Sequence, residues 1–279
     1  MTNEAQSRVA LITGAAGGLG TVMTQALLED GHRVVAMDTD EAALTALMML
    51  AEGADASDGL FTITGDVAVE RDCKRAVAEG MGRFGALDIV VNNAGIGPSF
   101  IRPDAERNHP SIMELTPEWW DRFYSINVRG AIQTVRAALP AMQASGWGRI
   151  VNNTTSFRTM LRILPYGSVK AALESLSAVW AAELEGSGIG VHVLVPGGPT
   201  DTGFISDDAG WDRDQMLRPD VFAAPIRWIA SNDSDGITGQ RYVAAHWDTN
   251  LPPSQAAEGC AAPIGWPDLG AAAVWPGSA

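Results

Sequence analysis

The chain has 279 residues, of which 46% are hydrophobic and 19% are charged, and this composition is typical of a folded globular domain. One α/β domain of this length buries a large core, so the length does not require two domains. The formal net charge of −14 argues against nucleic acid or an anionic membrane as a main partner, because both repel an acidic surface.

Strand-like and helix-like segments alternate through the first half of the chain. Apolar runs predict strands over residues 9–13, 33–38, 61–64 and 87–92, and helical spacing predicts helices over residues 19–29, 41–50 and 69–83. Thr116 and Pro117 supply an N-cap and a first helical residue for a long helix that reaches toward Ala144. This order indicates repeated strand–helix–strand units.

The second half continues the alternation. Strands are expected over residues 149–153, 191–195 and 241–243, and helices over residues 166–185 and 219–230. Apolar strands without polar alternation are typical of a sheet that helices cover on both faces. The sequence therefore predicts an α/β fold with a doubly wound parallel sheet of about seven strands.

Two stretches interrupt this pattern. Residues 97–115 form a polar, proline-containing segment, and long loops of this kind are usually functional or disordered. We expect residues 1–248 to form a single domain and residues 249–279 to form a C-terminal extension. Trp266 and Trp275 favour an extension that packs on its own or a neighbouring subunit, and disorder is the alternative.

A glycine-rich turn follows the first strand. It reads Thr13-Gly14-Ala15-Ala16-Gly17-Gly18-Leu19-Gly20 and leads into a predicted helix. Free N–H groups and the positive end of a helix attract a pyrophosphate there, and Gly14, Gly18 and Gly20 let the backbone come close to it. The turn therefore predicts a dinucleotide site, and a tight turn without a ligand is the alternative.

Asp38 ends the second strand. A carboxylate at this place accepts hydrogen bonds from the adenosine ribose hydroxyls and repels a 2′-phosphate. No basic residue follows it closely, so NAD is expected rather than NADP. The alternative role of Asp38 is the N-cap of the next helix.

Six motifs, in this order, resemble those of the short-chain dehydrogenase/reductase family. They are residues 13–20, Asp66-Val67, Asn92-Asn93-Ala94-Gly95, Asn127, Tyr166 with Lys170, and Pro196-Gly197, and the resemblance spans residues 8–245. It implies a Rossmann-type fold, a homodimer or homotetramer, and a nicotinamide cofactor. The resemblance places these further residues at the cofactor: Leu19, Asp66, Val67, Asn93, Ala94, Gly95, Tyr166, Lys170, Pro196 and Gly197.

Tyr166 and Lys170 stand one helical turn apart and can carry out proton chemistry. A secondary alcohol loses a hydride only as its hydroxyl proton leaves, so the site needs a base. Tyrosine, with a usual pKa of about 10, is a poor base at neutral pH. We expect the Lys170 ammonium and an oxidised nicotinamide to lower the pKa of Tyr166. By resemblance, Lys170 also holds the nicotinamide ribose, and Asn127 connects Lys170 to solvent through a water.

One departure from the family concerns the serine that it places thirteen residues before the tyrosine. Counting back from Tyr166 gives Asn153, whereas counting forward along the strand gives Thr155, with Ser156 next. A threonine hydroxyl polarises a substrate oxygen as a serine does. We therefore favour Thr155 as the catalytic hydroxyl and keep Ser156 as the alternative.

Three loops at the carboxyl ends of strands are expected to select the substrate. They are residues 157–165, the long segment after Gly95, and residues 200–217. Two sets of side chains in these loops favour substrates of different polarity. The aromatic and apolar residues favour an apolar or ring-bearing one: Phe157, Met160, Leu161, Phe204, Ile205 and Trp211. The arginines in these loops would suit an anionic one: Arg102, Arg107, Arg158 and Arg162.

The sequence thus predicts a cytoplasmic NAD-dependent enzyme that interconverts a small secondary alcohol and a ketone. Cys73 and Cys260 lie far apart without metal-ligand spacing, so reduced thiols and no metal site are expected. The N-terminal residues lack an apolar signal core, and no membrane span is expected. The rival hypotheses are a catalytically inactive NAD-binding regulatory protein, and dehydration or epimerisation with a recycled cofactor.

Overall fold

The computed structural model describes residues 7–270 of the chain, and within them eight strands form one sheet. The strand order is β3-β2-β1-β4-β5-β6-β7-β8. The strands are β1 (Val9–Thr13), β2 (Arg33–Asp38), β3 (Leu60–Thr64), β4 (Ile89–Asn92), β5 (Gly148–Asn153), β6 (Ile189–Val195), β7 (Gln240–Val243) and β8 (Ala261–Pro263). The first seven are parallel, which confirms the doubly wound sheet. The eighth, which the sequence did not predict, is antiparallel to β7.

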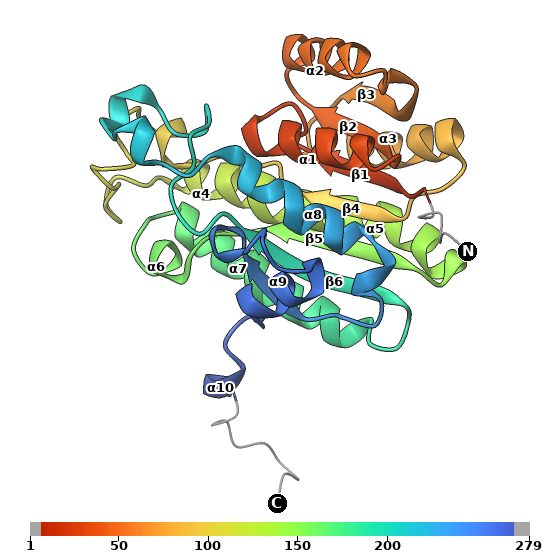
Figure 1. Ribbon diagram of the computed structural model, residues 1–279. Coiled ribbons are helices and arrows are strands. Elements are labelled where there is room, and N and C mark those ends of the chain that lie inside the picture. The colour runs from red at the N-terminus through yellow and green to blue at the C-terminus, as the bar shows by residue number, and fades with distance from the viewer. Residues whose placement is uncertain (1–6, 271–279) are drawn as a thin grey trace, which may run out of the picture.

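Helices cover both faces of the sheet (Figure 1). One apolar cluster joins a face of the strands to α1 (Gly18–Glu29), α2 (Glu41–Gly53), α8 (Ala223–Ala230) and α9 (Pro253–Cys260). The other cluster joins the opposite face to α3 (Glu70–Phe84), α5 (Gly130–Ser145) and α7 (Tyr166–Glu183). The short helices are α4 (Pro117–Tyr124), α6 (Phe157–Met160) and α10 (Pro267–Gly270). None of the helices in residues 7–270 has the length and apolar character needed to cross a membrane.

The helix expected from Pro117 to Ala144 is not continuous. Its first part, α4, ends at Tyr124, a π-helical turn occupies Ser125–Arg129, and α5 follows. Such a turn inserts an extra residue and changes the direction of the side chains that follow. Asn127 lies inside it, so the turn decides where this side chain points.

The residues after Asp248 that the structure describes pack on their own chain. Helix α9 contributes Ala257 and Cys260 to the same cluster as α8, and Ile264 packs against Val193 and Val195. Trp275 lies outside the described residues. The segment 249–270 therefore covers one edge of the sheet in the single chain.

A buried histidine makes the stability of this fold sensitive to acid. His192 on β6 is fully buried, and neither ring nitrogen has a hydrogen-bond partner within the described residues. Burial, and then the nearby Arg149, lowers the pKa of His192 to about 3 from 6.5. Between about pH 6.5 and pH 3, His192 binds a proton in the unfolded chain but not in the folded chain. The free energy of unfolding therefore falls as the pH drops through this range.

We expect His192→Leu to remove up to about 1.4 kcal/mol per pH unit from this dependence. Urea unfolding at several values between pH 6.5 and pH 4 measures the slope for each protein. His246→Leu, at an exposed position, is the matched control and should keep the wild-type slope. An unchanged slope in His192→Leu would show that the acid sensitivity arises elsewhere.

Candidate active site

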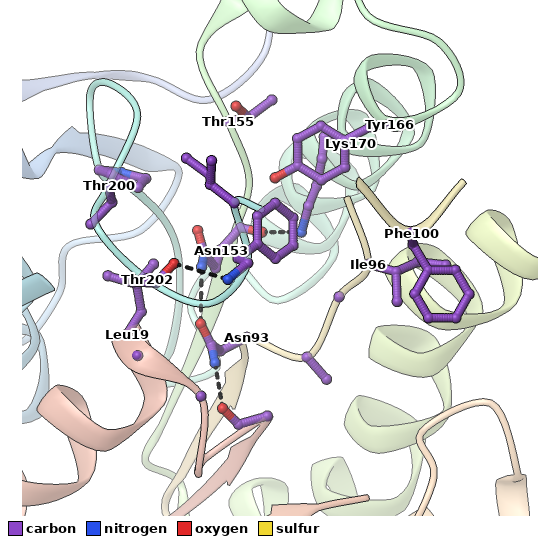
Figure 2. A pocket seen from close by; sticks show the side chains of 18 of the residues that line it. Leu19, Asn93, Ile96, Phe100, Asn153, Thr155, Tyr166, Lys170, Thr200 and Thr202 are labelled. Atoms are coloured by element: carbon purple, nitrogen blue, oxygen red, sulfur yellow. Dashed lines mark hydrogen bonds between the residues drawn. The ribbon is translucent and has the colours of Figure 1, made fainter. Parts of the chain in front are cut away.

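A cavity of about 900 Å³ lies at the carboxyl ends of the strands, where the strand order reverses between β1 and β4. Ligands bind at this place in open α/β sheets. Figure 2 shows Leu19 and Asn93 on one side of it and Tyr166, Lys170 and Thr155 on the other. Nearly all of the expected cofactor residues line the cavity: Gly14, Gly18, Leu19, Asp38, Asp66, Val67, Asn93, Ala94, Gly95, Tyr166, Lys170, Pro196 and Gly197.

The glycine turn has the shape of a phosphate cradle. Gly14 has a φ of +62°, and a Cβ there would lie 2.8 Å from the Ala94 Cα. A Cβ at Gly18 would lie 2.4 Å from the methyl group of Thr202. Helix α1 starts after Gly17 without a side-chain cap, so its first N–H groups face the cavity free of a capping side chain. The turn therefore fits the pyrophosphate of a dinucleotide.

Gly20 has a different place from the one expected. It does not line the cavity but lies under the turn, where a Cβ would approach the Gly14 carbonyl oxygen to 2.1 Å. Its role is thus to let helix and turn pack closely. Gly17, Gly18 and Leu19, which line the cavity, are the residues of this turn next to Gly20 that a ligand could contact.

Asp38 ends β2 and lines the cavity next to the glycine turn. Its Oδ2 accepts a hydrogen bond from the Ala16 N–H at 3.0 Å, and its Oδ1 accepts one from the Asp40 N–H at 3.2 Å. The N-cap of α2 is Asp40, which accepts from the Ala43 N–H, so the capping role considered for Asp38 is wrong. The Asp38 carboxylate keeps free lone pairs for ribose hydroxyls.

Lys170 is buried beside Tyr166 on the first turns of α7. Its Nζ donates to the Asn153 carbonyl oxygen at 2.7 Å and lies 5.7 Å from the centre of the Tyr166 ring (Figure 2). Burial lowers the pKa of Lys170 to about 8, so most of it is still an ammonium at pH 7. The positive charge of Lys170 therefore lies close to the Tyr166 ring.

Tyr166 departs from the expectation in one respect. Burial, and then the Glu106 carboxylate, raise its pKa above the usual value, although a hydrogen bond with the Thr155 hydroxyl acts in the opposite direction. In the chain alone, Lys170 therefore does not prepare a phenolate at neutral pH. A further positive charge next to the phenol is needed.

The two candidate hydroxyls have different partners. The Thr155 hydroxyl lies near enough to the Tyr166 hydroxyl to lower its pKa, whereas Ser156 Oγ caps α6 by accepting from the Thr159 N–H at 3.1 Å. Ser156 Oγ also lies 2.9 Å from the Thr159 hydroxyl. Both residues line the cavity, but only the Thr155 hydroxyl lowers the pKa of the phenol.

Asn127 lies behind Gly95. Its Nδ2 donates to the carbonyl oxygens of Ile96 and Phe123, and its buried Oδ1 has no hydrogen-bond partner among residues 7–270. A Cβ at Gly95 would lie 2.6 Å from this Oδ1 and 3.5 Å from the Lys170 Nζ. The missing side chain of Gly95 thus lets the two polar groups approach each other.

Only some of the residues that were expected to select the substrate line the cavity. Arg158, Arg162, Phe204, Ile205 and Trp211 line the cavity, and the Phe204 ring is tilted against the Tyr166 ring with 5.6 Å between the ring centres. The other expected residues do not line it: Arg102, Arg107, Phe157, Met160 and Leu161. Arg102 is paired with Glu114, and Leu161 is 82% exposed.

Four residues of the long loop and of the helix that follows it were not predicted from the sequence as site residues. Phe100, Glu106, His109 and Arg122 line the same cavity. Glu106 is buried, its carboxylate accepts from the Ser99 hydroxyl at 3.2 Å, and burial raises its pKa. Nothing in the sequence separates Glu106 from less buried acidic neighbours such as Asp104, because its burial depends on tertiary contacts.

This geometry defines an α/β protein whose cavity has the lining that a dinucleotide would need, with a tyrosine and a lysine beside it. The family model described as short chain dehydrogenase matches residues 8–211. The chain belongs to the short-chain dehydrogenase family of oxidoreductases.

Three relatives illustrate the similarity. Fluoren-9-ol dehydrogenase of Terrabacter sp. is 27% identical over 266 residues, covering 88% of this chain and 72% of that protein. 2-(R)-hydroxypropyl-CoM dehydrogenase of Xanthobacter autotrophicus is 34% identical over 194 residues, covering 68% and 74%. The crystal structure of 3-ketoacyl-(acyl-carrier-protein) reductase from Brucella melitensis, complexed with NADH, superposes with a TM-score of 0.70 at 27% identity, covering 84% and 94%.

Proposed function

We propose that this protein is an NAD-dependent dehydrogenase/reductase that interconverts a secondary alcohol and a ketone, with Tyr166 as general acid/base. The observation that carries the proposal is the cavity itself. It brings the glycine turn, Asp38, the phenol of Tyr166, the Lys170 ammonium and the Thr155 hydroxyl to one space.

Each polar residue of the cavity then has a defined task. A bound nicotinamide supplies the site that accepts or donates hydride, and its oxidised form adds positive charge. The Tyr166 hydroxyl exchanges a proton with the substrate oxygen, and the Thr155 hydroxyl donates a hydrogen bond to that oxygen. Lys170 stabilises the phenolate by charge. Asn127 Oδ1 accepts from a water that passes protons between Lys170 and solvent.

Two observations support NAD as the cofactor. The related Brucella protein was crystallised with NADH, and the Asp38 carboxylate faces the place where an adenosine ribose would lie. A carboxylate there repels a 2′-phosphate. The assignment of NAD rather than NADP therefore rests on Asp38.

The apolar side chains of the cavity suit a ring-bearing alcohol. Ile96, Phe100, Phe204 and Trp211 line the cavity, and the Phe204 ring packs against the Tyr166 ring. The Terrabacter relative is named for fluoren-9-ol, an alcohol with three fused rings. Arg158 and Arg162 are exposed where they line the cavity, so an anionic group on the substrate is the second candidate.

A panel of alcohols tests the proposal. The protein is incubated with NAD and, in turn, 2-butanol, cyclohexanol, 1-phenylethanol and 9-fluorenol, and NADH is followed by its absorbance. We expect NADH with at least one ring-bearing alcohol. NAD binding without NADH would favour the regulatory protein, and a changed substrate without net NADH would favour dehydration or epimerisation.

The choice between Thr155 and Ser156 gives a second test. Thr155→Ala should lower kcat by about 10²-fold to 10³-fold, because the substrate oxygen loses a donor where negative charge develops. Ser156→Ala should leave kcat close to wild type, because Ser156 mainly caps α6. The reverse pattern in steady-state kinetics would assign the role to Ser156.

We also propose a homodimer or homotetramer, as the alanine-rich helix α7 suggests. Its surface keeps Val179 exposed. Gel filtration of the full chain gives the assembly size, and a monomer would contradict this assignment.

A further inference from the structure

A buried ion pair lies behind the wall of the cavity. Arg241 on β7 and Glu174 on α7 are 2.7 Å apart between Nη1 and Oε2, and their side chains are 4% and 0% exposed. Taking two charges out of water is costly, and a buried pair often stabilises a fold no more than apolar residues of equal volume. Its contacts therefore matter more than its contribution to stability.

The pair holds the two residues that directly follow β5. The Thr154 hydroxyl donates to Glu174 Oε2 at 2.8 Å and accepts from Arg241 Nη1 at 3.1 Å. Arg241 Nη2 donates to the Thr155 carbonyl oxygen at 2.6 Å. One guanidinium thus fixes the backbone of Thr155, which lines the cavity together with Tyr166 and whose hydroxyl lowers the pKa of that phenol.

The C-terminal extension reaches the same pair from the other side. Residues 261–266, which we call the strap, contain β8, and Ala262 of β8 lies opposite Arg241. The Gly265 N–H donates to Glu174 Oε1 at 3.2 Å. The Trp266 ring packs 5.7 Å from the Phe157 ring, and the Arg241 guanidinium lies 4.3 Å above that same ring.

We propose that Glu174, Arg241 and the strap form a positioning device that sets the Thr155 hydroxyl against Tyr166. This inference rests on the roles proposed for Thr155 and Tyr166. Arg241 and Glu174 are positioning residues and do not line the cavity. The extension thereby becomes part of the catalytic machinery, because it supplies a hydrogen bond to Glu174 and an aromatic contact to the residue two positions after Thr155.

The expected effect is on the rate rather than on cofactor binding. A misplacement of about 1 Å at a catalytic group can cost about 100-fold in rate. Arg241→Met keeps an unbranched side chain but removes the three hydrogen bonds to Thr154, Thr155 and Glu174, so kcat should fall by about 10-fold to 100-fold with an unchanged Kd for NAD. Arg241→Lys should recover part of kcat, because its ammonium still pairs with Glu174 but lacks the second nitrogen for Thr155.

The experiment uses the full chain, NAD and the panel alcohol with the highest kcat/KM. Active sites are counted by NAD binding, so a partly unfolded sample does not lower kcat by itself. Arg149→Met is the matched control, because Arg149 is a buried arginine at the opposite end of β5 that bonds Ser234 and Asp235. It should lower the melting temperature but leave kcat per NAD site unchanged.

A double-variant cycle separates positioning from general loss of structure. If Arg241 acts through Thr155, Arg241→Met should cause little further loss of kcat in a Thr155→Ala background. Losses that multiply would overturn the inference, as would wild-type kcat in Arg241→Met. Should that variant not fold, the same cycle with Arg241→Lys decides by the same criteria. Trp266→Ala should also lower kcat, and wild-type kcat there would remove the strap from the device.

Failure of the proposed function has a different signature. Wild-type protein that forms no NADH from any panel alcohol, or Thr155→Ala with normal kcat, would contradict the roles assigned to the site. If Thr155→Ala has a lowered kcat and Arg241→Met has the wild-type kcat, only the proposed positioning device is contradicted, and the proposed function is not.

Discussion

Tyr166→Phe is expected to lower kcat by about 10³-fold or more while NAD still binds with wild-type affinity. The substitution removes one oxygen from a ring that stays packed against Phe204. The substitution removes the oxygen that the proposal assigns to accept the alcohol proton, and general acid/base catalysis contributes about 10²-fold to 10⁴-fold. NADH formation measures the loss, and calorimetric titration with NAD measures the affinity.

Tyr124→Phe is the matched control for this variant. Tyr124 lies exposed at the end of α4, and its loss of a hydroxyl should leave kcat unchanged. Normal turnover by Tyr166→Phe would contradict the general acid/base role. Loss of NAD binding together with turnover would instead show that the substitution disturbs the cavity.

Wild-type protein should use NAD at least about 100-fold more efficiently than NADP, and Asp38→Asn should lower this ratio at least about tenfold. Two unit charges 4 Å apart interact by about 4 kcal/mol near a protein surface, and about 1.4 kcal/mol corresponds to a tenfold change. The asparagine removes this repulsion of a 2′-phosphate and keeps an oxygen for one backbone N–H. Values of kcat/KM with both cofactors give the ratio.

Asp40→Asn is the control for the cofactor ratio. Asp40 is the neighbouring carboxylate that caps α2, so its loss should leave the preference for NAD intact. Equal efficiency of the wild-type protein with the two cofactors would contradict the role of Asp38.

The main outline of the fold could be predicted because its causes are local. Apolar runs bounded by glycine and proline predict buried parallel strands, and each of the seven expected strands is present within one or two residues at each end. Strand β8 could not be predicted, because Ala261–Pro263 lacks an apolar run and becomes a strand only by pairing with β7. The π-helical turn at Asn127 could not be predicted either, because the local sequence pattern does not show it.

The residues of the candidate site were predictable where spacing alone brings them together. Four residues along one helix place Tyr166 next to Lys170, and the glycine turn follows from its own sequence. The electrostatics were not predictable in this way. The raised pKa of Tyr166 depends on burial and on Glu106 from a distant loop, and the tail that pairs with Arg241 and bonds Glu174 lies beyond every motif.

The ionisation of Tyr166 with and without NAD tests most directly whether this phenol accepts the proton beside a bound nicotinamide. Ultraviolet difference spectra of the wild-type protein minus Tyr166→Phe isolate its phenolate absorbance from that of the other tyrosines. We predict that the pKa of Tyr166 lies above about 10, its usual value, in the protein alone, and that saturating NAD lowers it toward neutrality. The same pKa in both titrations would contradict this central claim.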